Sequence, residues 1–209
     1  MNPMTDPGQK KIIVLASGRG SNFQAIIDAL ESGDIPATCI RLITDNPFAY
    51  AIERAQNAGI PVSVVDFEAF PSKTQYEEAL LAVLAECNPD LILLAGYMRI
   101  VGPDIVRRFR GRIINIHPAL LPSFPGLHGQ RQAVDYGVKV SGCTVHFVDE
   151  QMDSGPIIVQ ACVPVLPGDD EDTLAERILH EEHLCFPRAV KLFCTDRLRI
   201  RGRVVEILE

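Results

Sequence analysis

The sequence lacks any long apolar run, and this absence argues against a membrane-spanning protein. No stretch of its 209 residues approaches the roughly 18 consecutive apolar residues of a transmembrane helix. The first ten residues are polar and contain no apolar core of a secretion signal. We therefore expect a cytoplasmic protein with no membrane association, in which residues 1–10 form a disordered or flexible tail.

Closely spaced cysteines and an excess of basic residues are absent as well. No two of the six cysteines are separated by only two residues, which argues against a zinc ribbon or a thioredoxin-like pair. The net charge of −7 argues against nucleic-acid binding, because a basic surface supplies most of that affinity. An anionic small substrate stays open, since one local cluster of donors can oppose the overall charge.

What the sequence does have is the size and pattern of one α/β domain, expected over residues 11–209. A chain of this length buries about 70% of its unfolded surface and needs no disulfide or metal to stay folded. Short apolar runs alternate with segments of helical periodicity. Strands are expected at 11–16, 39–44, 62–65, 91–95, 113–116, 143–148 and 156–165, helices at 23–31, 49–58, 74–87, 104–109, 130–136 and 173–193, and a hairpin at 198–208.

The order of these elements predicts the architecture. Alternating strands and helices imply a mainly parallel, twisted sheet flanked by helices. The strands at 143–148 and 156–165 have no helix between them, so the C-terminal part is expected to be antiparallel. Ligands bind at the carboxyl ends of the strands in such sheets. We therefore expect the turns at 17–22, 96–99 and 115–117 to meet at one edge.

The turn at residues 17–22, Ser-Gly-Arg-Gly-Ser-Asn, follows the first strand and opens a helix. Backbone N–H groups at a helix start, together with the helix dipole, favour an anion such as a phosphate. A dinucleotide-binding loop is a rival, and Asp45 resembles the acidic residue that binds a ribose in such folds. However, the third glycine of that motif would fall at Phe23, which blocks close packing of helix on strand. A tight connection without any ligand is the other alternative.

Asn115 and His117 are the main candidates for chemistry. Side chains alternate along a strand, so both point to the same face at the end of the strand at 113–116. An amide can stabilise an oxyanion and an imidazole can shuttle a proton, which suits acyl chemistry. Asp153, in the turn before a later strand, could reach the same edge and favour the imidazolium form of His117. The plainer alternatives are backbone-satisfying roles for Asn115 and His117 and an ordinary turn role for Asp153.

A zinc site is a further alternative, because His117, His128, His146 and Asp153 include ligand types that zinc accepts. No pair among them has the close helical spacing of a metalloprotease motif. We therefore expect no metal. We expect His128 and His146 to support the site through hydrogen bonds or to lie in the core.

Six motifs stand out in order along the chain: SGRGSN (17–22), LAGYMRI (94–100), NIHPALLP (115–122), PGLH (125–128), VHFV (145–148) and DSGP (153–156). Together they resemble the phosphoribosylglycinamide formyltransferase family over residues 11–193. The resemblance implies a Rossmann-like formyltransferase fold. It also implies transfer of the formyl group of 10-formyltetrahydrofolate to the primary amine of glycinamide ribonucleotide in purine biosynthesis. It implies no formyl-enzyme and no metal.

The resemblance also assigns roles to residues. Asn115 steadies the oxyanion, His117 donates the proton, and Asp153 stabilises the protonated form of His117. Glu182 is expected nearest the ribose hydroxyls. Separately, we expect the protein to be a monomer or a homodimer. The ribonucleotide is expected on Gly20, Ser21, Asn22, Leu179, His180, Glu181 and Glu182. The reduced folate is expected on Lys73, Met98, Arg99, Ile100, Val101, Asn115, Asp149, Glu150, Gln151, Met152 and Asp153.

Three positions depart from the family pattern. Ala119 stands where relatives usually carry serine, and Ser123 where a basic residue often follows. Lys73 replaces an arginine of some members, which keeps the charge but loses bidentate geometry.

Rival functions share part of this pattern. Methionyl-tRNA formyltransferase has a further C-terminal domain, and formyltetrahydrofolate hydrolase has an N-terminal regulatory domain; we expect room for neither in this chain. A non-catalytic phosphometabolite sensor belongs to a different class of function. The presence of Asn115, His117 and Asp153 together argues against it.

Overall fold

The structure is a computed structural model that describes residues 9–209. The chain forms two compact units, a first unit that ends at Ile113 and a second unit from Ile114 to Glu209. Most of the expected N-terminal tail, residues 1–8, lies outside the described residues, whereas Lys10 already belongs to the first strand. All six cysteines are free thiols.

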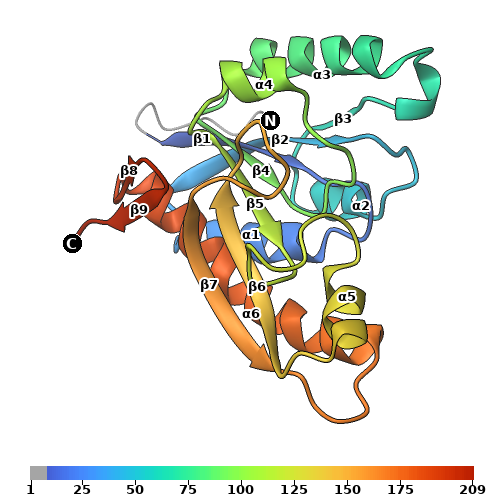
Figure 1. Ribbon diagram of the computed structural model, residues 1–209. Helices are drawn as coiled ribbons and strands as arrows, with labels where there is room; N and C mark the ends of the chain where they lie inside the picture. Colours follow the sequence, from blue (N-terminus) through green and yellow to red (C-terminus); the bar gives the residue numbers. More distant parts are fainter. Residues whose placement is uncertain (1–8) are drawn as a thin grey trace. The chain divides into compact units, whose positions relative to one another are not determined.

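The first unit is a parallel sheet with helices on both sides. Its strands lie in the order β3-β2-β1-β4, and each adjacent pair is parallel. Figure 1 shows α3 and α4 on one side of these strands and α1 and α2 on the other. The elements are β1 (Lys10–Leu15), α1 (Ser21–Glu31), β2 (Ala37–Thr44), α2 (Ala51–Asn57), β3 (Val62–Val64), the 3-10 turn η1 (Phe67–Ala69), α3 (Lys73–Cys87), β4 (Leu91–Leu94) and α4 (Pro103–Arg108).

Burial explains why the two central strands are almost wholly apolar. Every residue of β4 is buried, and so are the last four residues of β1, because helices cover both faces of the sheet. Since β1, β2 and β4 run parallel, their carboxyl ends lie at one edge. That edge carries the turn at residues 17–22, called the glycine turn below, and the turn at residues 96–101, called the β4 turn.

The second unit is mainly antiparallel. Its strands lie in the order β5-β6-β7-β9-β8, and the only parallel pair among them is β7 with β9. Helix α6 packs against β6 and β7 (Figure 1). The elements are β5 (Ile113–His117), which leads into the unit, α5 (Gly129–Tyr136), β6 (Val140–Phe147), β7 (Ile157–Pro164), α6 (Glu171–Cys194), β8 (Leu198–Arg201) and β9 (Val204–Ile207). The predicted fold class, a parallel α/β sheet with an antiparallel C-terminal part, is confirmed.

Candidate active site

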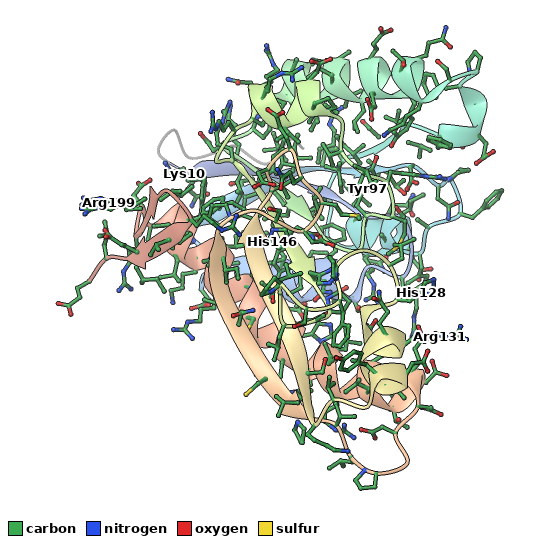
Figure 2. The ribbon with its side chains drawn as sticks, in the orientation of Figure 1. Lys10, Tyr97, His128, Arg131, His146 and Arg199 are labelled. Atoms are coloured by element: carbon green, nitrogen blue, oxygen red, sulfur yellow. The ribbon has the colours of Figure 1, made fainter. Side chains whose placement is uncertain are left out.

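The pairing of β5 with β6 gathers polar side chains on one face of the second unit. Asn115 lies opposite His146, and His117 lies opposite Thr144. Directly opposed residues of an antiparallel pair project from the same face, so these four side chains are neighbours. Both histidines are buried, with exposed fractions of 4% for His117 and 1% for His146. Figure 2 labels His146 on β6.

Asp153 joins this group from the loop between β6 and β7. Its Oδ2 atom accepts a hydrogen bond from the Gly126 amide at 2.7 Å and lies 3.5 Å from His117 Nδ1. Its Oδ1 atom lies 3.7 Å from His146 Nε2. Because the Asp153 side chain is only 12% exposed, water screens its charge weakly. The structure thus places the carboxylate beside the imidazole of His117.

A close backbone approach sets the position of Asp153. A Cβ atom on Gly155 would lie 1.7 Å from the carbonyl oxygen of Phe147, so only glycine fits there. The Phe147 amide donates to the carbonyl of Pro156 at 2.9 Å, which closes the turn. Asp153 itself has φ +50°, a left-handed conformation that aspartate adopts more readily than most residues. These contacts aim its carboxylate at the β5–β6 face.

The ring of His117 faces an oxygen atom at each nitrogen. Its Nε2 atom donates to the carbonyl of Phe124 at 2.9 Å, and its Nδ1 atom faces Asp153. Only the imidazolium form carries a hydrogen on both nitrogens. Each ring nitrogen of His117 therefore lies beside an oxygen atom that can accept a hydrogen bond.

The second buried histidine, His146, favours its neutral form. Burial lowers the pKa of His146 below its ordinary value of 6.5, against the opposing influence of the Phe147 carbonyl and Asp153. Its Nδ1 atom lies 2.9 Å from the Phe147 carbonyl and donates to it, so Nε2 of the neutral ring is an acceptor. Asn115 Nδ2 donates to that acceptor at 3.2 Å. This bond uses one amide hydrogen of Asn115 and orients the other.

Thr144 and Gln160, which sequence analysis did not single out, hold the loop that contains Phe124. Thr144 Oγ1 donates to the carbonyl of Ala119 at 2.7 Å and accepts from the amide of Leu121 at 3.0 Å. Gln160 Nε2 donates to Thr144 Oγ1 at 2.9 Å and to the carbonyl of Leu121 at 3.0 Å. The β6–β7 register pairs Thr144 with Gln160, and no local motif reveals such a pairing.

In the first unit, the glycine turn has the geometry of an anion site. Gly20 has φ +67°, and a Cβ atom there would lie 2.8 Å from Ala51 Cβ. The Ala51 amide donates to the Gly18 carbonyl at 3.1 Å, and Arg54 Nε donates to the Arg19 carbonyl at 2.8 Å. Helix α1 starts without a side-chain cap or an acidic residue in its first turn. Helix starts of this kind bind phosphates and carboxylates.

The β4 turn is held by a cation and two tyrosines. Arg99 Nε donates to Asp45 Oδ2 at 2.9 Å, and the guanidinium lies 3.8 Å from the ring centre of Phe67. Asp45, which resembled a ribose-binding acid, is thus the buried partner of Arg99. The hydroxyl of Tyr97, labelled in Figure 2, is hydrogen-bonded to that of Tyr76 on α3, and burial raises the pKa of Tyr97.

Comparison with known proteins identifies the family. The formyl transferase family matches residues 10–190. The chain belongs to this family. It is 42% identical over 189 residues to the phosphoribosylglycinamide formyltransferase of Escherichia coli (strain K12), covering 90% of this chain and 89% of that protein. A crystal structure of glycinamide ribonucleotide transformylase 1 from Symbiobacterium toebii superposes with a TM-score of 0.94 at 49% identity, covering 100% of this chain and 99% of that one.

The chain also resembles part of a larger protein. It is 48% identical over 206 residues to the trifunctional purine biosynthetic protein adenosine-3 of Drosophila pseudoobscura pseudoobscura. That match covers 98% of this formyl transferase but only 15% of the relative.

The remaining residues expected to bind folate lie mostly at the surface. In the first unit of this formyl transferase, Met98 and Ile100 are exposed, and Lys73 Nζ lies 3.4 Å from Glu77 Oε1. In the second unit, Met152 is exposed, and Asp149 Oδ1 accepts from the Gln151 amide at 3.0 Å. Exposed apolar side chains beside turns offer contact area for a planar ligand.

The residues of α6 that are expected to bind the ribonucleotide differ in their exposure to solvent. Glu182 is buried, whereas the side chain of His180 is 74% exposed, with Nδ1 3.4 Å from Glu181 Oε1. His128 lies away from the Asp153 group: its side chain is 69% exposed, and its Nδ1 atom lies 3.4 Å from Glu171 Oε1.

The zinc alternative finds no support in this geometry. Across residues 9–209, no three His, Cys, Asp or Glu side chains are grouped as metal ligands would be. His128, one of the four residues considered, faces Glu171 instead.

A separate finding concerns membranes: none of the helices within the described part of the chain has the length and apolar character to cross a bilayer.

Proposed function

We propose that this formyl transferase moves the formyl group of 10-formyltetrahydrofolate to the primary amine of glycinamide ribonucleotide, a step of purine biosynthesis. The observation that carries the proposal is the group formed by Asn115, His117, His146 and Asp153 in the second unit. The names of the E. coli and Symbiobacterium toebii relatives support the same substrate.

Formyl transfer needs a hydrogen-bond donor for the oxyanion and a proton donor, and we assign these roles to Asn115 and His117. The amine nitrogen attacks the formyl carbon, and the carbonyl oxygen becomes an oxyanion. The second amide hydrogen of Asn115, oriented by His146, can donate to that oxygen. No metal ion is assigned a role in this step.

Collapse of the tetrahedral intermediate completes the balance of protons. The bond between the formyl carbon and the folate N10 breaks, and N10 takes up a proton as it leaves. The attacking nitrogen loses one proton, so the overall reaction moves one proton from amine to N10. His117 supplies the proton to N10 and regains one from the attacking nitrogen, and Asp153 stabilises the imidazolium while His117 holds the proton.

The phosphate of the ribonucleotide is proposed to bind at the glycine turn. The uncapped start of α1 and the crowding of Gly20 by Ala51 support this assignment. The ribose hydroxyls are assigned to the segment from Leu179 to Glu182 by the family resemblance. A direct transfer gains most of its rate from holding both reactants in attack geometry.

The family resemblance assigns the reduced folate to the β4 turn, to Lys73 and to the loop at residues 149–153. The exposed side chains of Met98, Ile100 and Met152 support this assignment, because a pterin ring needs apolar contact area. We further propose a cytoplasmic monomer or homodimer that acts on these small molecules alone.

An absorbance assay of folate deformylation tests the proposal against its rivals. We expect turnover only when 10-formyltetrahydrofolate and glycinamide ribonucleotide are both present. Turnover with the folate alone would instead identify a hydrolase. No turnover under either condition, with the ribonucleotide still bound, would identify a sensor.

A further inference from the structure

The glycine turn and the β4 turn are hydrogen-bonded to each other through Ser17. The Ser17 amide donates to the carbonyl of Gly96 at 3.1 Å. The Ser17 hydroxyl accepts from the amide of Met98 at 2.9 Å. Ser17 is the first residue of the glycine turn, and both of these hydrogen bonds connect it to the main chain of the β4 turn.

The two residues that follow β2, Asp45 and Asn46, add hydrogen bonds to the same two turns. Asn46 Nδ2 donates to the Ser17 carbonyl at 3.2 Å, and Asp45 accepts from Arg99 of the β4 turn at 2.9 Å. Asn46 therefore holds the glycine turn, and Asp45 holds the β4 turn. A displacement of either turn is resisted by the other through Ser17, Asn46 and Asp45.

We infer that Ser17 couples the two substrate sites, so that the ribonucleotide and the reduced folate each bind more tightly when the other is present. This inference rests on the proposed function, which assigns the ribonucleotide phosphate to the glycine turn and the folate to the β4 turn. A ligand that orders one turn orders the other through the Ser17 hydroxyl. The second ligand then loses less conformational entropy on binding. The coupling must be equal in both directions.

The Ser17 hydroxyl can be tested without dismantling the fold. Ser17→Ala removes the acceptor of the Met98 amide but keeps the main-chain bond to Gly96. Met98 is an exposed residue outside the core, so we expect the variant to fold. Ser17→Thr keeps the hydroxyl and should keep the coupling. Ser32→Ala is a matched control, because the Ser32 hydroxyl donates to the carbonyl of Ala29 at the far end of α1.

Calorimetric titration of glycinamide ribonucleotide, with and without saturating tetrahydrofolate, measures the coupling directly. Tetrahydrofolate carries no formyl group, so both ligands bind without reacting. We expect tetrahydrofolate to tighten ribonucleotide binding by at least about fivefold in the wild type, Ser17→Thr and Ser32→Ala. We expect less than about twofold tightening in Ser17→Ala. If Ser17→Ala does not fold, Ser17→Cys, with a weaker acceptor of similar size, takes its place.

The outcomes separate this inference from the proposed function. Binding of both ligands with no coupling in the wild type overturns the inference and leaves the proposed function standing. Full coupling in Ser17→Ala likewise overturns the role of Ser17. Failure of either ligand to bind the wild type overturns the proposed function, and the inference falls with it.

Discussion

Replacing Asp153 with asparagine removes one negative charge and changes the shape of the site very little. The asparagine keeps an oxygen that can accept the hydrogen bond from the Gly126 amide, which Asp153 accepts at 2.7 Å. It loses the charge that faces His117 Nδ1 at 3.5 Å. The variant therefore tests the electrostatic role of the carboxylate with the loop intact.

The size of the effect follows from this distance. Opposite unit charges 3.5 Å apart interact by about 4–5 kcal/mol at an effective dielectric constant of roughly 20. We reduce this to about 2–4 kcal/mol, because the side chain is 12% exposed and some water remains near it. Each 1.4 kcal/mol changes a rate about tenfold, so kcat should fall by about 30- to 1,000-fold.

Steady-state formyl transfer, followed by folate absorbance, measures this loss, and thermal unfolding verifies that the variant is folded. Asp135→Asn is a matched control, because Asp135 is an exposed residue of α5 whose carboxylate lies 3.8 Å from Arg131. It should leave the rate unchanged. A folded Asp153→Asn variant with kcat within about threefold of the wild type would refute the electrostatic role.

Three further predictions concern stability and substrate affinity. Because burial lowers the pKa of His146, the unfolded chain takes up a proton more readily than the folded chain below pH 6.5. The free energy of unfolding should therefore decrease as pH falls below 6.5, and urea denaturation should show a flatter pH profile for His146→Asn. Gly155→Ala should destabilise the protein by more than about 3 kcal/mol in the same assay, because the methyl group meets the Phe147 carbonyl. The control Gly168→Ala, with φ +89° and open space around it, should cost only about 1 kcal/mol. Gly20→Ala should raise KM for the ribonucleotide by about tenfold with a smaller change in kcat; an unchanged KM would move the phosphate elsewhere.

Local patterns in the sequence predicted the fold well. The apolar runs of β1 and β4 and the helical periodicity of α1 and α3 mark elements whose burial the structure confirms. The missing helix before β7 correctly predicted the antiparallel part. Strand β6 begins at Val140, three residues before the expected start at Cys143, because exposed Val140 continues the pairing with β7 beyond the apolar run.

The side-chain partners in the site depended on register and loop geometry, which periodicity does not contain. The alternation of side chains along β5 is enough to predict that Asn115 and His117 lie on one face. The bond of Asn115 to His146 and the support of the loop by Gln160 follow from strand register. The sequence did not show that His128 would face Glu171. The direction of its side chain depends on the left-handed backbone conformation of His128, φ +61°, which sequence periodicity does not reveal.

Transfer of isotope from 10-formyltetrahydrofolate, labelled with carbon-13 in the formyl group, gives the most direct test. After incubation with glycinamide ribonucleotide, mass spectrometry should find the label in a formylated ribonucleotide, and His117→Ala should lose most of that product. Label that appears as free formate, or equal product from His117→Ala, would contradict the proposed reaction or the role of His117.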